Sequence, residues 1–541
     1  MPKRLTSRLG LVAGLALLVG LTPDTGSAQT LEPIVYTVKV SAPDKHVAEV
    51  EAVVPTGKRP SIEMMMAVWS PGFYRVQDYA KQVEDLSART PDGMALEVEH
   101  PEKNRWRIQT GGGLKVVVSY RLTCRQASVT TNYVGDDLGV LNGAATFITL
   151  AEQARRPHEV RLELPAKWKR SMTALDPAPD GLPNHYRAPD YDTLVDSPIV
   201  AGDPSVHEFE VDGSKHFLVD AGDLGSWDGV KAAQELNKIV QGTRRFWGFL
   251  PFKTYYFLNV FRRGGGGLEH KNSTLLTASP PRAATSQANF RWLSFVSHEY
   301  FHSFNVKRLR PIELGPFDYE HPPRTGSLWI PEGLTTYFGD LIVVRAGLGT
   351  TEDYLASMSS HIGQLQNSPG RLVQTLEQSS LDVWSSGTSG VGRSRATSVS
   401  YYVKGPVVGF LLDAKIRRVT GGKKSLDDVM RLAYKRYAGE HGFTPDQFRM
   451  TAEEVAGADL KDWFRRALSS TEELDYTEAL DWFGLRFVPI EEPTKKDEAG
   501  KKDETAKKDE PSRKWRLEVR ANATEAQKVH LRRLLEPAEG T

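Results

Sequence analysis

Hydrophobic and polar positions alternate in the first third of the chain. The alternation has a period of two and occurs in short runs: YTVKV at 36–40, AEVEAVV at 48–54, LKVVVSYRL at 114–122 and EVRLEL at 159–164. Clusters of Pro, Gly, Asn and Asp separate these runs. Such a pattern predicts half-buried strands joined by turns, and therefore an antiparallel β domain over residues 31–205, with a sandwich as one arrangement that fits.

Longer segments with helical spacing follow, which predicts a mainly helical domain over residues 206–485. Helices are expected at 231–249, at 290–304, and from Pro331 to about 347. The apolar aromatic run YYFLNVF at 255–261 predicts a strand, and four glycines at 264–267 follow it, which indicates a close approach of the backbone to another group. The β domain has no concentration of His and carboxylate residues, so we expect it to shape or support a site that the second domain carries.

Both ends of the chain have distinctive compositions. Basic residues at 3, 4 and 8, an apolar run at 9–21 and small residues at 26–28 predict a cleaved signal peptide over residues 1–28. The apolar run is shorter than the roughly 20 residues that a spanning helix needs. No other segment is long and apolar enough to cross a membrane. We therefore expect a periplasmic or secreted protein without a stable membrane span after signal removal.

Near the C-terminus, residues 491–514 contain the tandem KKDEAG, KKDETA and KKDEPS, which has no large apolar residue. This composition predicts a disordered charged linker. The pattern after it, at 515–541, predicts one strand and one helix. That segment is too small to fold alone, so we expect it to dock on the body of the protein.

Charge and cysteine content limit the possible functions. The chain has 69 Lys and Arg residues against 68 Asp and Glu residues, for a net charge of +1, and this balance argues against nucleic-acid binding. Cys124 is the one cysteine, so neither an intrachain disulfide nor a cysteine-based metal cluster can form. Any metal must therefore be held by His, Asp or Glu. Cys124 ends the predicted strand VVVSYRLTC, which favours a buried structural residue over a nucleophile.

The string HEYFH at 298–302 carries the most specific chemistry. On a helix, positions i and i+4 share a face, so His298 and His302 can bind one ion. Glu299 points about 100° away, where it can act as a base on a water without binding the ion. A surface helix with two unrelated histidines is the alternative.

A catalytic zinc takes three protein ligands and keeps one position open. Glu332, in LWIPEGLTTYFGD, is the candidate third ligand, because Pro331 suits the first position of a helix and places Glu332 in its first turn. An acidic residue there is also favoured by the helix dipole alone. The residues by themselves leave these two interpretations open.

The segments HEYFHSFNVKRLRP and LWIPEGLTTYFGD resemble the glycyl aminopeptidase family, metallopeptidases related more distantly to aminopeptidase N and to thermolysin. GGLEH at 266–270 and VWSPGFYRVQDYA at 68–80 are also similar to segments of that family, so the resemblance reaches from the β domain to about residue 485. It implies a thermolysin-like zinc peptidase domain, one Zn²⁺ per chain on His298, His302 and Glu332, and an aminopeptidase that acts on peptides with a free N-terminus and a small first residue.

The resemblance also suggests groups that contact the substrate. Glu269, with Gly266 and Gly267, matches the amine-binding segment of the aminopeptidase N relatives, and a carboxylate beside the metal would select a free ammonium by charge. An exposed glutamate in a tight hairpin is the alternative. His270 could orient its neighbour.

A tyrosine of SYYVKGPVV is similar to the oxyanion-stabilising tyrosine of these relatives. Tyr402 is the first choice for that role and Tyr401 the second. Asp340, two turns beyond Glu332, could orient a ligand histidine or could equally be a solvated acid.

Two departures from the family pattern stand out. Phe304 takes the place of a usual tryptophan, which should not affect the ligands. Many members carry a PDZ domain after the catalytic region, whereas here FGLRF at 483–487 is followed by the charged tandem, so we expect that module to be missing or degenerate. The other candidate functions are a zinc endopeptidase and an inactive peptide-binding protein of the same fold. The sequence does not determine the oligomeric state.

Overall fold

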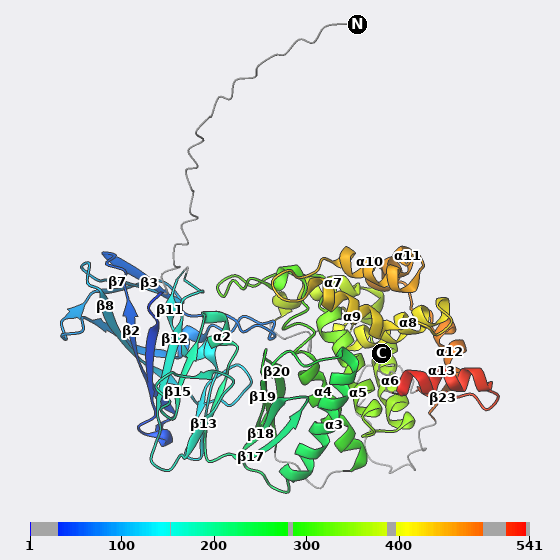
Figure 1. The fold of residues 1–541 in the computed structure, drawn as a ribbon, viewed down its shortest axis with the longest axis horizontal. Coiled ribbons are helices and arrows are strands. Elements are labelled where there is room, and N and C mark those ends of the chain that lie inside the picture. The colour runs from blue at the N-terminus through cyan, green and yellow to red at the C-terminus, as the bar shows by residue number, and fades with distance from the viewer. Residues whose placement is uncertain (2–30, 152, 280–284, 387–395, 491–514, 537–541) are drawn as a thin grey trace, which may run out of the picture.

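The structure is a computed structural model that describes Met1 and residues 31–151, 153–279, 285–386, 396–490 and 515–536. The predicted signal peptide at 1–28 and the predicted linker at 491–514 lie outside these residues. Figure 1 shows a β-rich N-terminal part beside a mainly helical part, which confirms the predicted fold class. Within the described ranges, no helix has both the length and the apolar character needed to cross a bilayer.

The four alternating runs form neighbouring strands of one sheet. This eight-stranded sheet has the order β14-β15-β12-β1-β2-β8-β4-β5, in which β1 and β12 pair in parallel and the other neighbours are antiparallel. Alternate residues of β1 are buried, as the period of two predicted. The strands are β1 (Ile34–Lys39), β2 (Val47–Pro55), β4 (Val83–Arg89), β5 (Ala95–Leu96), β8 (Lys115–Thr123), β12 (His158–Glu163), β14 (Asp176–Pro177) and β15 (His185–Ala188).

Two four-stranded sheets complete the β domain, with the orders β13-β16-β10-β9 and β11-β3-β7-β6. Cys124 is fully buried in the core of this domain, as expected for a structural residue. The strands are β3 (Ser61–Met65), β6 (Val98–Glu102), β7 (Arg105–Gln109), β9 (Tyr133–Val134), β10 (Leu138–Leu141), β11 (Thr149–Leu150), β13 (Arg170–Met172) and β16 (Ile199–Gly202), and the short helices are α1 (Gly143–Thr146) and α2 (Tyr191–Val195).

A five-stranded sheet opens the second part of the chain, in the order β17-β18-β19-β21-β20. The aromatic run forms its central strand, as predicted. Three of the four glycines that follow, at 265–267, are part of the edge strand β20, which pairs antiparallel with β21. The strands are β17 (Ser205–Val211), β18 (Ser214–Gly222), β19 (Thr254–Phe261), β20 (Gly265–Glu269) and β21 (Ser273–Ala278).

The helices pack against this sheet and against one another around a large apolar core. The predicted helices at 231–249 and 290–304 are α3 and α4. The helices of this part are α3 (Gly229–Trp247), α4 (Ser286–Phe301), α5 (Thr335–Arg345), α6 (Thr351–Gln366), α7 (Leu376–Leu381), α8 (Tyr401–Val419), α9 (Leu426–Tyr437), α10 (Pro445–Ala456), α11 (Lys461–Leu468) and α12 (Thr477–Phe483).

The helix expected to begin at Pro331 begins two residues earlier, so that prediction was wrong. A π-helical turn, Trp329–Leu334, runs directly into α5, and the Glu332 N–H donates to the Leu328 carbonyl at 2.9 Å. Proline is tolerated here because the first N–H groups of a helix have no partner within the helix. Isolated π turns often occur at functional sites, and this one carries Glu332.

The C-terminal segment contains the strand and the helix that the sequence predicted. β22 (Leu485–Pro489) pairs antiparallel with β23 (Trp515–Val519), and α13 (Glu525–Leu535) follows. Leu534 is fully buried in the core of the helical part. The segment therefore docks on the body of the protein.

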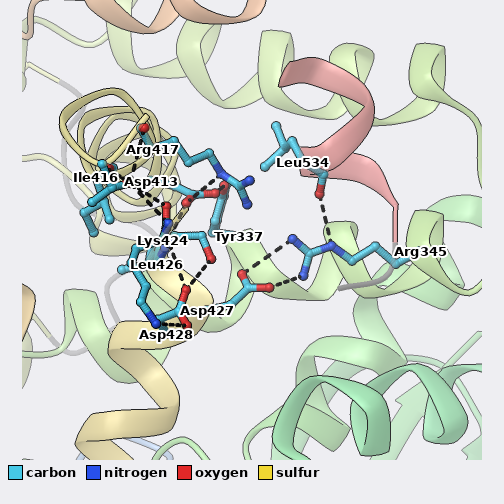
Figure 2. Close-up of polar contacts among 12 residues, drawn as sticks. Tyr337, Arg345, Asp413, Ile416, Arg417, Lys424, Leu426, Asp427, Asp428 and Leu534 are labelled. Carbon is cyan, nitrogen blue, oxygen red and sulfur yellow. Dashed lines mark hydrogen bonds and ion pairs between the residues drawn. The ribbon is translucent and has the colours of Figure 1, made fainter. Parts of the chain in front are cut away.

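A buried polar cluster ties α13 to the helices behind the site (Figure 2). Arg345 of α5 donates to Asp427 of α9 at 2.8 Å and to the Leu534 carbonyl of α13 at 3.0 Å. Asp413 of α8 accepts from the Tyr337 hydroxyl at 2.8 Å. Because α5 continues the turn that carries Glu332, these contacts fix the position of that turn.

Replacing Asp427 with asparagine should lower the free energy of unfolding of the helical part by about 3–5 kcal/mol, because the Arg345 charge would stay buried without its counter-charge. Urea unfolding followed by circular dichroism measures the change. Glu454→Gln, which removes an exposed ion pair with Arg436, is the control and should leave the transition almost unchanged. Equal shifts in the two variants would contradict this assignment.

Candidate active site

Helix α4 and the π turn bring the three predicted metal ligands together. The Nε2 atoms of His298 and His302 lie 2.9 Å apart. One Glu332 carboxylate oxygen lies 3.7 Å from the first of these atoms and 3.3 Å from the second. One ligand atom from each residue lies within 4.8 Å of the other two. The i, i+4 spacing thus acts as the sequence predicted, and Glu332 completes a set of three.

Hydrogen bonds on the far side of each ring fix the orientation of the imidazoles. His302 Nδ1 donates to the Asn305 carbonyl at 2.9 Å. The Thr336 hydroxyl donates to the Glu332 carbonyl at 2.9 Å, so His298 Nδ1, 3.3 Å away, donates to the Thr336 oxygen. With a proton on each Nδ1, both Nε2 lone pairs point toward the Glu332 carboxylate.

This donor set fits a divalent cation. Three acceptor atoms converge, and the second oxygen of Glu332, Oε1, is buried without a hydrogen-bond partner among the described residues. Although burial lowers the pKa of an imidazole, the Glu332 and Glu269 carboxylates raise the pKa of His302 to about 9. The two carboxylates thus favour positive charge at this position, and a divalent cation would supply it. Two imidazoles and one carboxylate form one of the known catalytic zinc sets.

Asp340 does not orient a ligand histidine, because Thr336 occupies that position. Asp340 lies one turn further along α5 and accepts a hydrogen bond from the Ser357 hydroxyl at 2.6 Å. Phe295 lines the cavity in front of the ligands, whereas its neighbour Val296 faces the core. Helical spacing shows which residues share a face but not what that face contacts.

Glu299 lies beside the ligands with its carboxylate against the backbone of β20. A Cβ on Gly267 would overlap that carboxylate, so the glycine allows the close approach that the sequence suggested. Glu299 is 5% exposed, and its Oε2 atom has no partner among the described residues. Burial, reinforced by the nearby Glu269, raises its pKa to about 8.

Glu269 ends strand β20 and is buried. The alternative of an exposed glutamate in a tight hairpin is correct for the hairpin, since β20 and β21 form an antiparallel pair. It is wrong for the side chain, because Glu269 is only 4% exposed. A Cβ on Gly72, a β-domain residue whose φ is 94°, would overlap the Glu269 carboxylate. Burial raises the pKa of Glu269, while His302 and Lys307 oppose the rise. Gly266, also predicted in the substrate site, does not line the cavity.

Sequence reasoning missed a buried charge network behind Glu269. Lys307 donates to Asp196 at 2.9 Å, and His270 Nδ1 lies 3.1 Å from the same oxygen. Asp196 comes from the β domain, directly after α2. Burial alone would lower the pKa of Lys307, but the Asp196 and Glu269 carboxylates raise it. A lysine in the HEYFHSFNVKRLRP segment is the one sequence signal that could have indicated this network.

Tyr402 lines the cavity, and its ring lies 6.3 Å from the ring of His298. Tyr401 is fully buried behind it and does not line the cavity. The geometry therefore favours Tyr402 for an oxyanion donor. Tyr74, from the β domain, is a second buried phenol that the sequence did not reveal: burial, with Glu332 and Glu269 nearby, raises its pKa.

The three candidate metal ligands, Glu299, Glu269 and Tyr402 line one cavity of about 760 Å³. The β domain supplies Gly72 and Phe73 to its wall, so that domain shapes the site, as expected. The other lining residues come from β20, α4 to α6, the π turn, the start of α8 and the segments that follow α6 and precede α8: Gly267, Glu269, Ser294, Phe295, His298, Glu299, His302, Glu332, Thr336, Asp340, His361, Gln364, Leu365, Ser368, Ser398, Val399, Ser400, Tyr402 and Val403.

Comparison with known proteins gives two kinds of match. Residues 35–203 match the Peptidase M61 N-terminal domain, and residues 291–408 match the M61 glycyl aminopeptidase domain. Together these ranges cover more than half of the chain. No curated protein sequence matches it.

Solved structures agree with these matches. An aminopeptidase N family protein from Idiomarina loihiensis is 28% identical, with a TM-score of 0.80 over 84% of this chain and 79% of that chain. A mutant of the M1 zinc metallopeptidase from Deinococcus radiodurans is 12% identical, with a TM-score of 0.51 over 82% of this chain and 95% of that chain. At that identity the second match shows the fold alone.

Proposed function

We propose that this chain, which belongs to the M61 glycyl aminopeptidase family, is a zinc-dependent aminopeptidase. Its substrates are peptides with a small first residue, glycine or alanine, which it removes. The observation that carries the proposal is the buried carboxylate of Glu269 beside the cluster of His298, His302 and Glu332. We expect one zinc ion per chain.

Glu269 and its surroundings support action at a free N-terminus. A buried carboxylate pairs strongly with an ammonium group and gains nothing from an N-acetyl group. Gly72 lines the cavity and packs directly on the Glu269 carboxylate. A residue that preceded the substrate's first residue would therefore meet protein, which favours an exopeptidase.

The proposed chemistry uses five residues of the chain. A zinc ion on His298, His302 and Glu332 would supply Lewis acidity toward the scissile carbonyl and a more acidic water. Glu299 accepts the proton of the attacking water and later delivers it to the leaving amine. The Tyr402 hydroxyl donates to the oxygen on which negative charge develops.

We also propose that the chain is exported, because residues 1–28 have the composition of a signal peptide. This part of the chain lies outside the described residues. Mass spectrometry of the mature N-terminus from a periplasmic or culture-medium fraction tests the proposal.

Replacing Glu269 with glutamine should reduce kcat/KM for free Gly- and Ala-peptides by about 100-fold, because a charge-paired contact to the ammonium is lost. Steady-state rates on free peptides and on their N-acetylated forms measure the effect. Glu313→Gln, an exposed glutamate, is the control. Equal cleavage of free and acetylated peptides by the unaltered protein would favour the endopeptidase alternative.

A further inference from the structure

The cavity has one carboxylate more than the proposed reaction uses. Its lining contains Glu269, Glu299, Glu332 and Asp340. The first three have roles as amine anchor, base and metal ligand. Among the described residues that line the cavity there is no lysine or arginine. Asp340 is therefore an unassigned negative charge in a cavity that already favours cations.

The surroundings of Asp340 leave it able to bind a cation. It is 6% exposed, and the Ser357 hydroxyl occupies one of its oxygens. Within the described part of the chain, no lysine or arginine pairs with it. Ser294 Oγ and His361 Nδ1, on the same cavity wall, are buried polar atoms that have no partner among the described residues. Burial lowers the pKa of His361, while the nearby Asp340 carboxylate opposes that shift.

Asp340 lies near the Ser294–His298 turn of α4, whereas Glu269 lies near His302, one to two turns further along. Glu269 interacts with His302 and Lys307, at the C-terminal end of α4. Asp340 lies along α5 in the other direction, where the adjacent Gly339 packs on the Ser294 carbonyl and on His298. A peptide whose ammonium is held at Glu269 and whose first carbonyl is at the metal therefore continues toward Asp340.

The distances agree with this placement. Asp340 follows Glu332 by eight residues, which places the two backbones about 12 Å apart along the helix axis. An extended peptide advances about 3.3–3.6 Å per residue. The second and third residues of the substrate, with long side chains, can reach this end of the cavity.

We propose that Asp340, with Ser294 and His361 beside it, forms a subsite for a basic side chain at the second or third position of the substrate. This inference rests on the proposed function, because Glu269 defines the direction of the peptide. The preferred substrates are then peptides that begin with glycine or alanine and continue with lysine or arginine. A carboxylate with polar neighbours binds an ammonium or guanidinium group by charge-assisted hydrogen bonds.

The test compares Gly-Lys-Ala and Gly-Ala-Lys with peptides that carry glutamine or glutamate in place of the lysine. The unaltered protein should show a kcat/KM at least about tenfold higher for lysine than for glutamine at one of the two positions, and the lowest value for glutamate. In Asp340→Asn this lysine-to-glutamine ratio should fall to about one. Glu352→Gln, an exposed acid on α6, should keep the ratio of the unaltered protein.

Two results would overturn the inference: a ratio near one in the unaltered protein, or an unchanged ratio in Asp340→Asn. The first measurement needs no substitution, so it decides even if Asp340→Asn fails to fold. Calorimetric binding of the same peptides to Glu299→Gln gives a second ratio that does not depend on turnover. A protein that binds the lysine peptides preferentially but hydrolyses none would contradict the proposed function and support the subsite.

Discussion

Replacing Glu299 with glutamine is expected to reduce kcat by about 10³- to 10⁴-fold, because the amide cannot accept the proton of the attacking water. The side chain is nearly isosteric and lies against Gly267, so the fold and the metal ligands should be unaffected. Steady-state hydrolysis of Gly- and Ala-peptides measures the loss, and metal analysis of the same preparation should still give one zinc per chain.

Glu313→Gln is the matched control for Glu299→Gln, since both remove one carboxylate but residue 313 is exposed and does not line the cavity. A Glu299→Gln protein that hydrolyses peptides at the unaltered rate would exclude Glu299 as the base. If the unaltered protein binds peptides but hydrolyses none, the inactive peptide-binding alternative holds. A retained base argues for the enzyme, because a structural metal site has no use for one.

Removal of the metal should abolish activity and lower thermal stability. We expect chelation to stop hydrolysis and added Zn²⁺ to restore it, because the ion supplies the Lewis acid that no other group replaces. His298→Gln removes one ligand and should weaken zinc binding by more than about 100-fold. This exceeds the usual effect of losing a group that only hydrogen-bonds to a ligand. Because an ion that binds the native state stabilises it, the unfolding midpoint should fall as well.

His361→Gln is the matched control for His298→Gln, because both imidazoles line the cavity and only residue 298 belongs to the ligand set. Metal content by mass spectrometry should be near zero in the first variant after dialysis and near one in the second. A His298→Gln protein that kept both its zinc and its activity would refute the proposed metal site.

The sequence determined the parts of the site that depend on short-range spacing. His298 and His302 share a helix face because 3.6 residues make a turn, and the structure places their Nε2 atoms 2.9 Å apart. The glycine run likewise indicated a close approach, which occurs between Gly267 and Glu299. Strand positions in the β domain also followed from local alternation, because one face of each strand packs in the core.

The position of Glu332 was predictable only in part. Its role as third ligand rested on a resemblance, because no spacing rule connects it to His298 across 33 intervening residues. The helix that carries it begins at Trp329 with a π turn, which neither proline preference nor hydrophobic period signals.

The tertiary structure alone decided which distant residues surround the catalytic groups. Gly72 and Asp196 come from the β domain, yet Gly72 packs on Glu269 and Asp196 pairs with Lys307. The sequence assigned that domain a supporting role but could not name these residues, because such contacts depend on how two separately patterned domains pack. The structure also shows that Asp340, a candidate partner of a ligand histidine, instead lines the cavity and accepts a hydrogen bond from Ser357. Local spacing therefore predicted the histidine pair and the neighbouring Glu299, whereas the packing of the domains determines the shape and charge of the cavity.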